Sequence, residues 1–169
     1  MQDVRGAASA AARLYDNDGL TPLLKAAQCG RIELVKLLCL LDPWSVGKKT
    51  KNDEKTFWHL LASQTFFDST SYGETGLEML LEMGSNRKAL KCLAEADNDG
   101  NTPLHIAIEK RNFHFARFVM EIAPEDSFEN IMRKRNSKDL TPIDLIGSAE
   151  YVPRQVMLSL LSFKMHGMM

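Results

Sequence analysis

Four segments of similar sequence recur along the chain and constrain its fold more than any other feature. In each, a polar turn leads to a threonine and then to an apolar helical pattern. A threonine there can cap the free backbone N–H groups of a helix, and a proline directly after it has no N–H to lose. Repetition on this scale predicts a solenoid, whose units bury their apolar faces against one another. The segments read DNDGLTPLLKAA from Asp16, KNDEKTFWHLLA from Lys51, DNDGNTPLHIAI from Asp97 and NSKDLTPIDLIG from Asn136.

The third segment resembles the ankyrin repeat, whose signature is a turn followed by Thr-Pro-Leu-His-x-Ala. It carries the whole signature, in Thr102, Pro103, Leu104, His105 and Ala107. The resemblance implies an all-α ankyrin-repeat solenoid of about four helix-turn-helix units with irregular insertions. The other segments keep part of the signature: Thr21, Pro22, Leu23 and Ala26, with Leu24 in place of histidine; Thr56 and His59, with Phe57 and Trp58 in place of Pro-Leu; and Thr141 and Pro142, with Asp144 in place of histidine.

Two places before each threonine stands the residue on which closure of the turn depends. Gly19 and Gly100 suit a turn that needs a positive φ. Glu54 and Asp139 occupy the same place in the other two segments. We therefore expect less regular turns in the second and fourth units.

A second helix is predicted in every unit from apolar residues at a 3.6-residue period. The pattern stands at the same offsets from the threonine in the first and third units, and it is delayed in the other two. Its members are Leu34, Val35, Leu37 and Leu38; then Leu77, Leu80 and Leu81; then Phe115, Ala116, Phe118 and Val119; and finally Met157, Leu160 and Leu161.

Insertions are expected, because the intervals between the threonines all exceed the ~33 residues of a regular array. The largest is QTFFDSTSYG over 64–73, whose three aromatic residues are either well packed or functional. Short extra helices are predicted around Leu90 and Leu93 and between Pro124 and Arg135. We expect an Ala-rich N-terminal helix or cap over 1–15, an ankyrin repeat domain over 16–163 with repeats starting near 16, 51, 97 and 136, and a tail over 164–169.

Composition excludes several classes of protein. The 169 residues fit one domain, and 44% hydrophobic with 25% charged residues is typical of water-soluble globular proteins. A net charge of −1 gives no global basic field for nucleic acid, and the longest apolar run, Leu37–Leu41, is too short to cross a bilayer. Three widely spaced cysteines favour a reducing compartment. We expect a monomeric cytoplasmic protein, or a nuclear one, without cofactors.

Catalysis is not expected, because the main phosphate-binding, zinc-protease and hydrolase motifs are missing from the sequence. In ankyrin repeats a histidine at the place of His59 and His105 ties its turn to the adjacent repeat, and we favour this role over a catalytic base. The cysteines are interpreted as buried or neutral thiols. Trp58 falls at an inward leucine position and is expected in the core, whereas Trp44 either packs under a turn or is exposed for a partner.

The family resemblance implies a non-catalytic scaffold or adaptor that binds another protein through a concave surface, formed by the turn tips and the exposed side of each first helix. The alternative is a targeting or regulatory ankyrin domain of a larger enzyme, channel or host-directed microbial effector, which would act in the host cytoplasm. The residues one place before each threonine are expected to form the central row of this surface. By position, the partner-binding residues are Asn17, Leu20, Gln28, Asn52, Lys55, Ser63, Asn98, Asn101, Glu109, Ser137 and Leu140.

Overall fold

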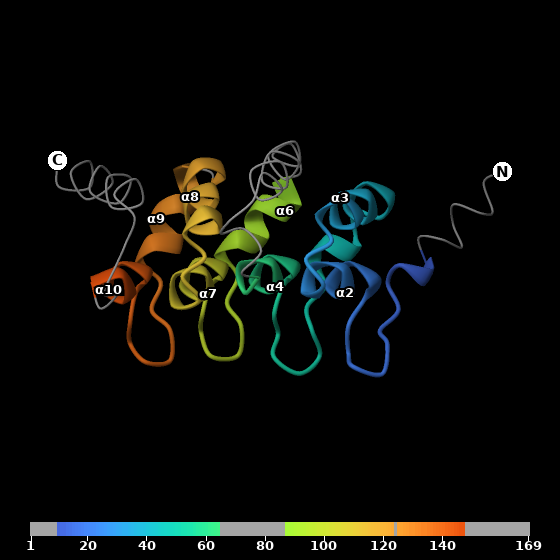
Figure 1. The fold of residues 1–169 in the computed structure, drawn as a ribbon, viewed down its shortest axis with the longest axis horizontal. Helices are drawn as coiled ribbons and strands as arrows, with labels where there is room; N and C mark the ends of the chain where they lie inside the picture. Colours follow the sequence, from blue (N-terminus) through green and yellow to red (C-terminus); the bar gives the residue numbers. More distant parts are fainter. Residues whose placement is uncertain (1–9, 65–86, 124, 148–169) are drawn as a thin grey trace.

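The structure is a computed structural model that describes residues 10–64, 87–123 and 125–147. Within these ranges the regular elements are α-helices and short 3₁₀ helices, without a strand. The helices follow one another in a row, and the turns between successive units project from the same side of it (Figure 1). The expected all-α solenoid is confirmed.

Units one and three show the complete helix pair. In unit one, α2 (Pro22–Gln28) is followed by α3 (Ile32–Leu41), and in unit three α7 (Pro103–Glu109) is followed by α8 (Phe113–Ile122). Both first helices begin with proline after a threonine in extended conformation, as the sequence predicts.

Units two and four are described through their first helices, α4 (Phe57–Ala62) and α10 (Pro142–Gly147). Their predicted second helices lie outside the described residues, as do residues 65–73 of the insertion. Both predicted extra helices are present: α6 (Arg87–Lys91) with the 3₁₀ helix η4 (Cys92–Ala94), and α9 (Glu125–Arg133). A further 3₁₀ helix, η1 (Ser45–Gly47), follows α3.

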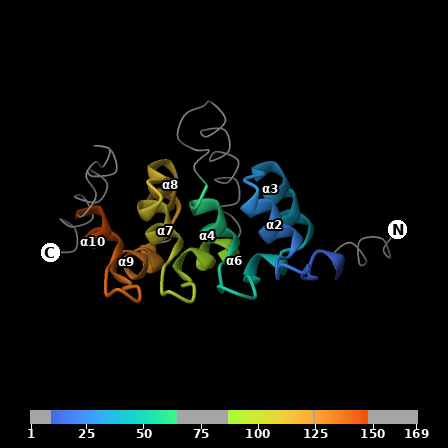
Figure 2. The same ribbon diagram turned by 60° about the horizontal axis from the view of Figure 1, so that its bottom comes forward.

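The first helices build the spine of the solenoid. Helices α2, α4, α7 and α10 contact one another in that order, and Figure 2 shows them side by side from a second direction. Trp58 on α4 is 1% exposed and packs against the rings of Phe115 and Phe118 on α8, with centroids 6.1 and 5.7 Å away. Its indole N–H donates to the carbonyl of Ala89 at 2.7 Å. The core position predicted for Trp58 is confirmed.

All four turns have a positive φ two places before the threonine, but the turn of unit two is one residue longer: Thr50 N donates to the carbonyl of Lys55, five residues later, whereas in the other units the bond spans four residues. The expected irregularity is confirmed for unit two and wrong for unit four. Gly19 and Gly100 have a φ of 75°, and Glu54 and Asp139 follow with 57° and 61°. Asp139 N donates to the carbonyl of Asn136 at 2.9 Å, the same bond that Gly19 forms with Asp16 and Gly100 forms with Asp97. An L-residue adopts this left-handed conformation at a cost of about 1–2 kcal/mol.

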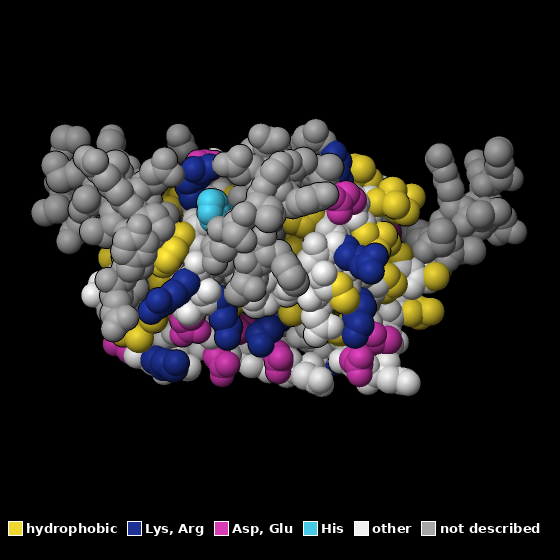
Figure 3. Space-filling model, in the orientation of Figure 1, with side chains coloured by type: hydrophobic (Ala, Val, Ile, Leu, Met, Phe, Trp, Pro, Cys, Tyr) yellow, Lys and Arg dark blue, Asp and Glu magenta, His cyan; other side chains and the backbone are white. Residues whose placement is uncertain are grey.

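The outward face of α3 is apolar, which the sequence pattern did not predict. Val35 is buried and Leu38 half-buried, but Leu34 and Leu37 from the same expected face are 40% and 51% exposed. Leucine continues along this face, and Figure 3 shows hydrophobic side chains gathered over α3. The equivalent apolar residues of α8 are all buried. The difference arises because α3 packs on α2 and η1 through a narrow stripe that leaves its opposite side uncovered.

The segment ahead of the first turn is described from Ala10 onward and is fixed to α3. The guanidinium of Arg13 donates from Nε and Nη2 to the two carboxylate oxygens of Asp42, both at 2.8 Å. Trp44, two residues later, is 68% exposed, and Lys88 Nζ lies 4.9 Å from the ring centroid. Of the two interpretations of Trp44, exposure is confirmed.

Candidate functional site

Each turn is organised by the side chain that opens it. Asp16 Oδ1 accepts the backbone N–H groups of Asp18 and Leu20, at 3.0 and 2.9 Å. Asp97 and Asn136 do the same for residues two and four places later, and the hydroxyl of Thr50 accepts one such bond in unit two. Short Asx and threonine side chains favour this local bonding. Their role was missed in the sequence, although they recur five residues (six for Thr50) before each repeat threonine.

Neighbouring turns are joined to one another by hydrogen bonds. We name the set of turn tips over 17–19, 52–54, 98–100 and 137–139 the turn ladder. Because backbone bonds cross every gap between repeats, the ladder is one continuous, preorganised surface. The bonds run from Lys51 N to Gly19 O at 3.1 Å, from Asn98 N to Asp53 O at 3.0 Å, from Asn98 Nδ2 to Asn52 O at 2.9 Å and from Ser137 N to Asp99 O at 2.8 Å.

Two buried histidines fix the ladder to the first helices. His59 Nδ1 accepts the N–H of Thr56 at 3.1 Å, so Nε2 carries the proton and donates to the carbonyl of Asn101 at 2.9 Å. His105 repeats this geometry with Thr102 and with the carbonyl of Leu140, at 3.1 Å. The predicted link from each histidine to the adjacent repeat is confirmed.

In the two units without histidine, other side chains stand three residues after the threonine. The Asp144 carboxylate accepts both the N–H and the hydroxyl of Thr141, at 2.9 and 2.8 Å, and these hydrogen bonds lower the pKa of Asp144. In unit one the fully buried Leu24 fills the position, and the Thr21 hydroxyl accepts its N–H at 3.4 Å. The hydroxyls of Thr56, Thr102 and Thr141 likewise accept the N–H three residues later, so all four threonines cap their helices through the side chain.

Comparison with protein families agrees with this geometry. The sequence model of the ankyrin repeat family matches residues 18–47 and 99–122, the first and third units. The chain is an ankyrin repeat protein. Repeats of this family generally mediate protein–protein interaction and are typically non-catalytic. Comparison with curated proteins gives no significant match.

Burial keeps the titratable side chains in the core of this ankyrin repeat protein uncharged. Burial lowers the pKa of His59 to about 4, and it also lowers the pKa of His105, so both rings are neutral at physiological pH. Burial raises the pKa of the Cys39 and Cys92 thiols to about 12 and about 11, which leaves little nucleophilic thiolate. In the described ranges, no three His, Cys, Asp or Glu side chains are grouped to hold a metal ion.

The expected partner-binding residues differ in how far their side chains are exposed. Asn17, Asn52, Asn98 and Ser137 are exposed, one on each tip of the turn ladder. Five more of the expected residues are exposed or half-buried and lie at the ends of the turn ladder or of the first helices: Gln28, Lys55, Ser63, Glu109 and Leu140.

Leu20 and Asn101 are corrections to the expected row. Both are buried, because the residue before the threonine is where the turn returns to the helices. Leu20 joins the apolar core, and the Asn101 amide oxygen accepts a hydrogen bond from Asn136 Nδ2 at 2.9 Å. Their side chains are not available to a partner.

Basic residues at the ends of the first helices were missed as candidates. Lys25 lies in the last turn of α2, and Arg31 precedes α3. Lys110 and Arg111 occupy the corresponding turn between α7 and α8, and all four side chains are exposed. When units one and three are aligned by their threonines, Lys110 and Arg111 correspond to Cys29 and Gly30, so the repeat pattern carries no signal for these basic residues. No helix in the described part of the chain is long and apolar enough to span a membrane.

Proposed function

We propose that this ankyrin repeat protein is a non-catalytic scaffold or adaptor, and that it binds a partner protein through the turn ladder and the adjoining ends of the first helices. The observation that carries the proposal is the ladder itself. It presents an exposed polar side chain at the same position of every repeat, on a backbone that hydrogen bonds have already ordered. Little conformational entropy is then lost when a partner binds.

Affinity capture with the intact chain as bait, followed by titration of the purified partner, tests the proposal. Asn52→Trp and Ser137→Trp place bulky neutral groups on two tips without removing a ladder bond, because the main chain forms the bonds at these two residues. We expect each variant to weaken binding by more than ~1 kcal/mol and to leave the unfolding midpoint nearly unchanged.

Leu37→Glu supplies the matched control, because Leu37 lies on the exposed apolar face of α3. A partner that tolerates both tryptophan variants and is lost with Leu37→Glu contradicts the proposed surface. Circular dichroism of each variant confirms that the helices are retained before affinities are compared.

A further inference from the structure

The large hydrophobic side chains that are exposed within the described ranges all belong to unit one and to the segments on either side of it. We name this set the apolar end. Its members are between 40% and 70% exposed, and Figure 3 shows hydrophobic side chains gathered at this end of the solenoid. The six residues are Leu14, Leu34, Leu37, Leu40, Leu41 and Trp44.

Helix α3 supplies most of the apolar end. Because they are spaced three and four residues apart, Leu34, Leu37 and Leu41 lie along one side of the helix. Val35 and Cys39 are buried on the opposite side. Seven residues of helix rise about 10 Å, which is the length of the exposed row. The outer side of a single helix is convex, and such a surface fits a deformable partner better than a rigid one.

The side chain of Asp42, buried at the end of α3, fixes the other members of the set. Its carboxylate accepts the two bonds from Arg13 and also the backbone N–H of Trp44, at 3.3 Å. Leu14, next to Arg13, and Trp44 are thereby held at the end of α3 that carries Leu41. The apolar end is therefore one patch, and exposed patches of this kind mark binding surfaces.

Three lysines lie beside the apolar end. Lys88 Nζ is 4.9 Å from the ring centroid of Trp44, which still is 68% exposed. Lys48 and Lys51 place their Nζ atoms 5.9 and 4.8 Å from the ring centroid of Tyr15, the residue after Leu14. Within the described part of the chain, these three lysines form no ion pair with a carboxylate.

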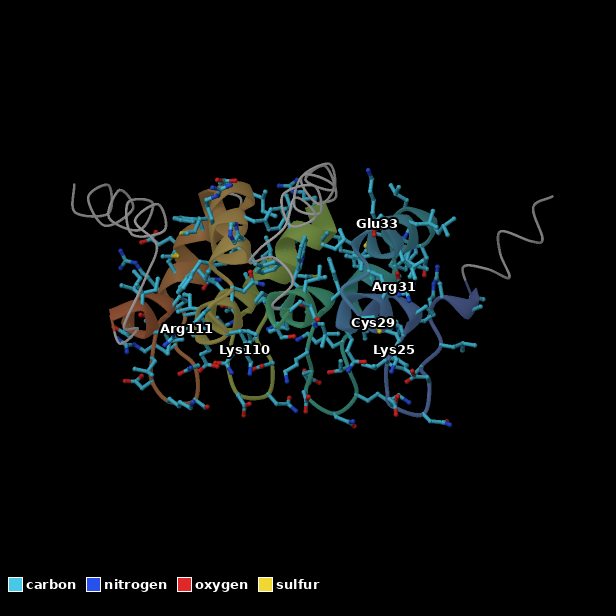
Figure 4. The ribbon with its side chains drawn as sticks, in the orientation of Figure 1. Lys25, Cys29, Arg31, Glu33, Lys110 and Arg111 are labelled. Atoms are coloured by element: carbon cyan, nitrogen blue, oxygen red, sulfur yellow. The ribbon has the colours of Figure 1, made fainter. Side chains whose placement is uncertain are left out.

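The other end of α3 carries one charge of each sign. Arg31 and Glu33 are both exposed, and Figure 4 labels them beside the start of the helix. From Arg31 to Lys48, Glu33 is the one exposed acidic residue. The border of the apolar end is thus basic overall, and a partner with a negatively charged surface is complementary to it.

The charge and the residue types favour one kind of partner. A second copy of the chain fits poorly, because an isologous contact brings the same basic residues together. A protein helix is less favoured, because leucine is under-represented among the residues that dominate protein interfaces. A bilayer with anionic headgroups takes up leucine at the boundary of its acyl chains, tryptophan at the level of the headgroups and lysine at its charged surface.

We propose that the apolar end binds the surface of a membrane that contains anionic lipids. The leucines of α3 enter the boundary between headgroups and acyl chains, Trp44 lies among the headgroups, and Lys88 and Lys48 bind lipid phosphates. Helix α3 and the turns lie on opposite sides of α2 (Figure 1), so the turn ladder stays accessible to a partner protein while the apolar end is bound. This inference goes beyond the proposed function and does not depend on it.

Sedimentation of the whole chain with vesicles tests the proposal. The probes are vesicles of phosphatidylcholine that contain phosphatidylserine, and vesicles of phosphatidylcholine alone. We expect binding to the anionic vesicles, with an affinity that falls as salt is raised above about 0.15 M. Binding should shift the tryptophan emission to shorter wavelength, because Trp44 leaves water whereas Trp58 is already 1% exposed. Trp44→Phe is expected to remove this shift.

Two matched pairs of variants separate the apolar end from the rest of the surface. Leu37→Glu and Asn52→Glu change the net charge equally, and Asn52 lies on the turn ladder. We expect Leu37→Glu to weaken vesicle binding roughly tenfold or more and Asn52→Glu to have little effect. Lys88→Gln is expected to weaken it about fivefold, and Lys138→Gln, also on the turn ladder, much less.

Equal binding to the two kinds of vesicle, equal effects within either matched pair, or an emission shift that persists in Trp44→Phe would overturn the membrane inference. Self-association without lipid that is lost with Leu37→Glu, in a chain that does not bind vesicles, would assign the apolar end to a second copy instead. Vesicle binding that tolerates Leu37→Glu refutes this inference and leaves the proposed function standing. A captured partner protein that tolerates Asn52→Trp and Ser137→Trp refutes the proposed function and leaves this inference standing.

Discussion

Lowering the pH from 7 to 5 is expected to destabilise the protein through His59. Its folded-state pKa of about 4 lies below the ordinary value of 6.5, chiefly because burial disfavours the charged ring, and Lys49 and Lys55 add to the effect while Asp97 and the bond to Asn101 oppose it. Between these two pKa values the unfolded chain binds more protons than the folded one. The contribution is therefore complete above about pH 6.5 and is lost as the pH falls toward 4.

The magnitude follows from the two proton affinities. Each tenfold difference is worth about 1.4 kcal/mol, so protonating the folded ring costs about 3 kcal/mol in full. About 2 kcal/mol of this is lost between pH 7 and pH 5. His105, whose pKa is also lowered by burial, adds to the loss in the same direction.

Urea unfolding at stepped pH, followed by tryptophan fluorescence, measures this dependence. His59→Leu copies the residue that unit one has at the same position, Leu24, and removes the titrating group. We expect the variant to be less stable at pH 7, because the bond to Asn101 is lost, and to show a pH dependence that is smaller by about 2 kcal/mol.

Leu60→Ala, on the same helix, is the control for destabilisation without loss of a titrating group. It is expected to lower the unfolding free energy at both pH values by the same amount. If His59→Leu keeps the full pH dependence of the unchanged protein, the acid sensitivity arises elsewhere and our account of His59 is refuted.

Three further outcomes are expected. Trp58→Ala should lower the unfolding free energy by roughly 3–5 kcal/mol, and Trp44→Ala by much less, because only Trp58 is buried; chemical denaturation that gives the reverse order contradicts the packing. Glu54→Gly should raise stability by up to about 1 kcal/mol by relieving its positive φ; a lower melting temperature counts against that reasoning. A thiol reagent at neutral pH should label the exposed Cys29 rapidly and the buried Cys39 only on unfolding, and equal labelling rates in the native protein speak against the burial.

The repeat signature predicted the local framework well. The roles of the threonine, proline and histidine of the signature depend on interactions between residues close in sequence. These are the capping of free N–H groups and the bond from the threonine N–H to a ring nitrogen of histidine. Such short-range rules predicted the positions of Thr102 and His105, the burial of Trp58 in the core, and the extra helices α6 and α9.

The turn of unit four shows where local reasoning failed. Glu54 and Asp139 were expected to disturb their turns, because glycine is the residue that adopts a positive φ most easily. Asp139 nevertheless adopts the conformation of the glycines, and Ser137 N in the same turn is bonded to Asp99 O of the neighbouring turn, whereas the turn of unit two is one residue longer. A sequence pattern within one unit does not contain this bond between turns.

The sequence determined the candidate site only as a set of equivalent positions in the four repeats. Which of these side chains are exposed was decided by the tertiary structure. Leu20 and Asn101 stand at the same offset as Lys55, yet both are buried because the next unit and the core cover them. Conversely, Leu37 has the pattern of a core residue and is exposed, since α3 meets its neighbours through another stripe. By itself the sequence determined that the chain forms capped helical repeats, because capping acts between residues close in sequence. Which side chains remain for a partner depends on the stacking of one repeat on the next, a long-range packing interaction that only the folded structure contains.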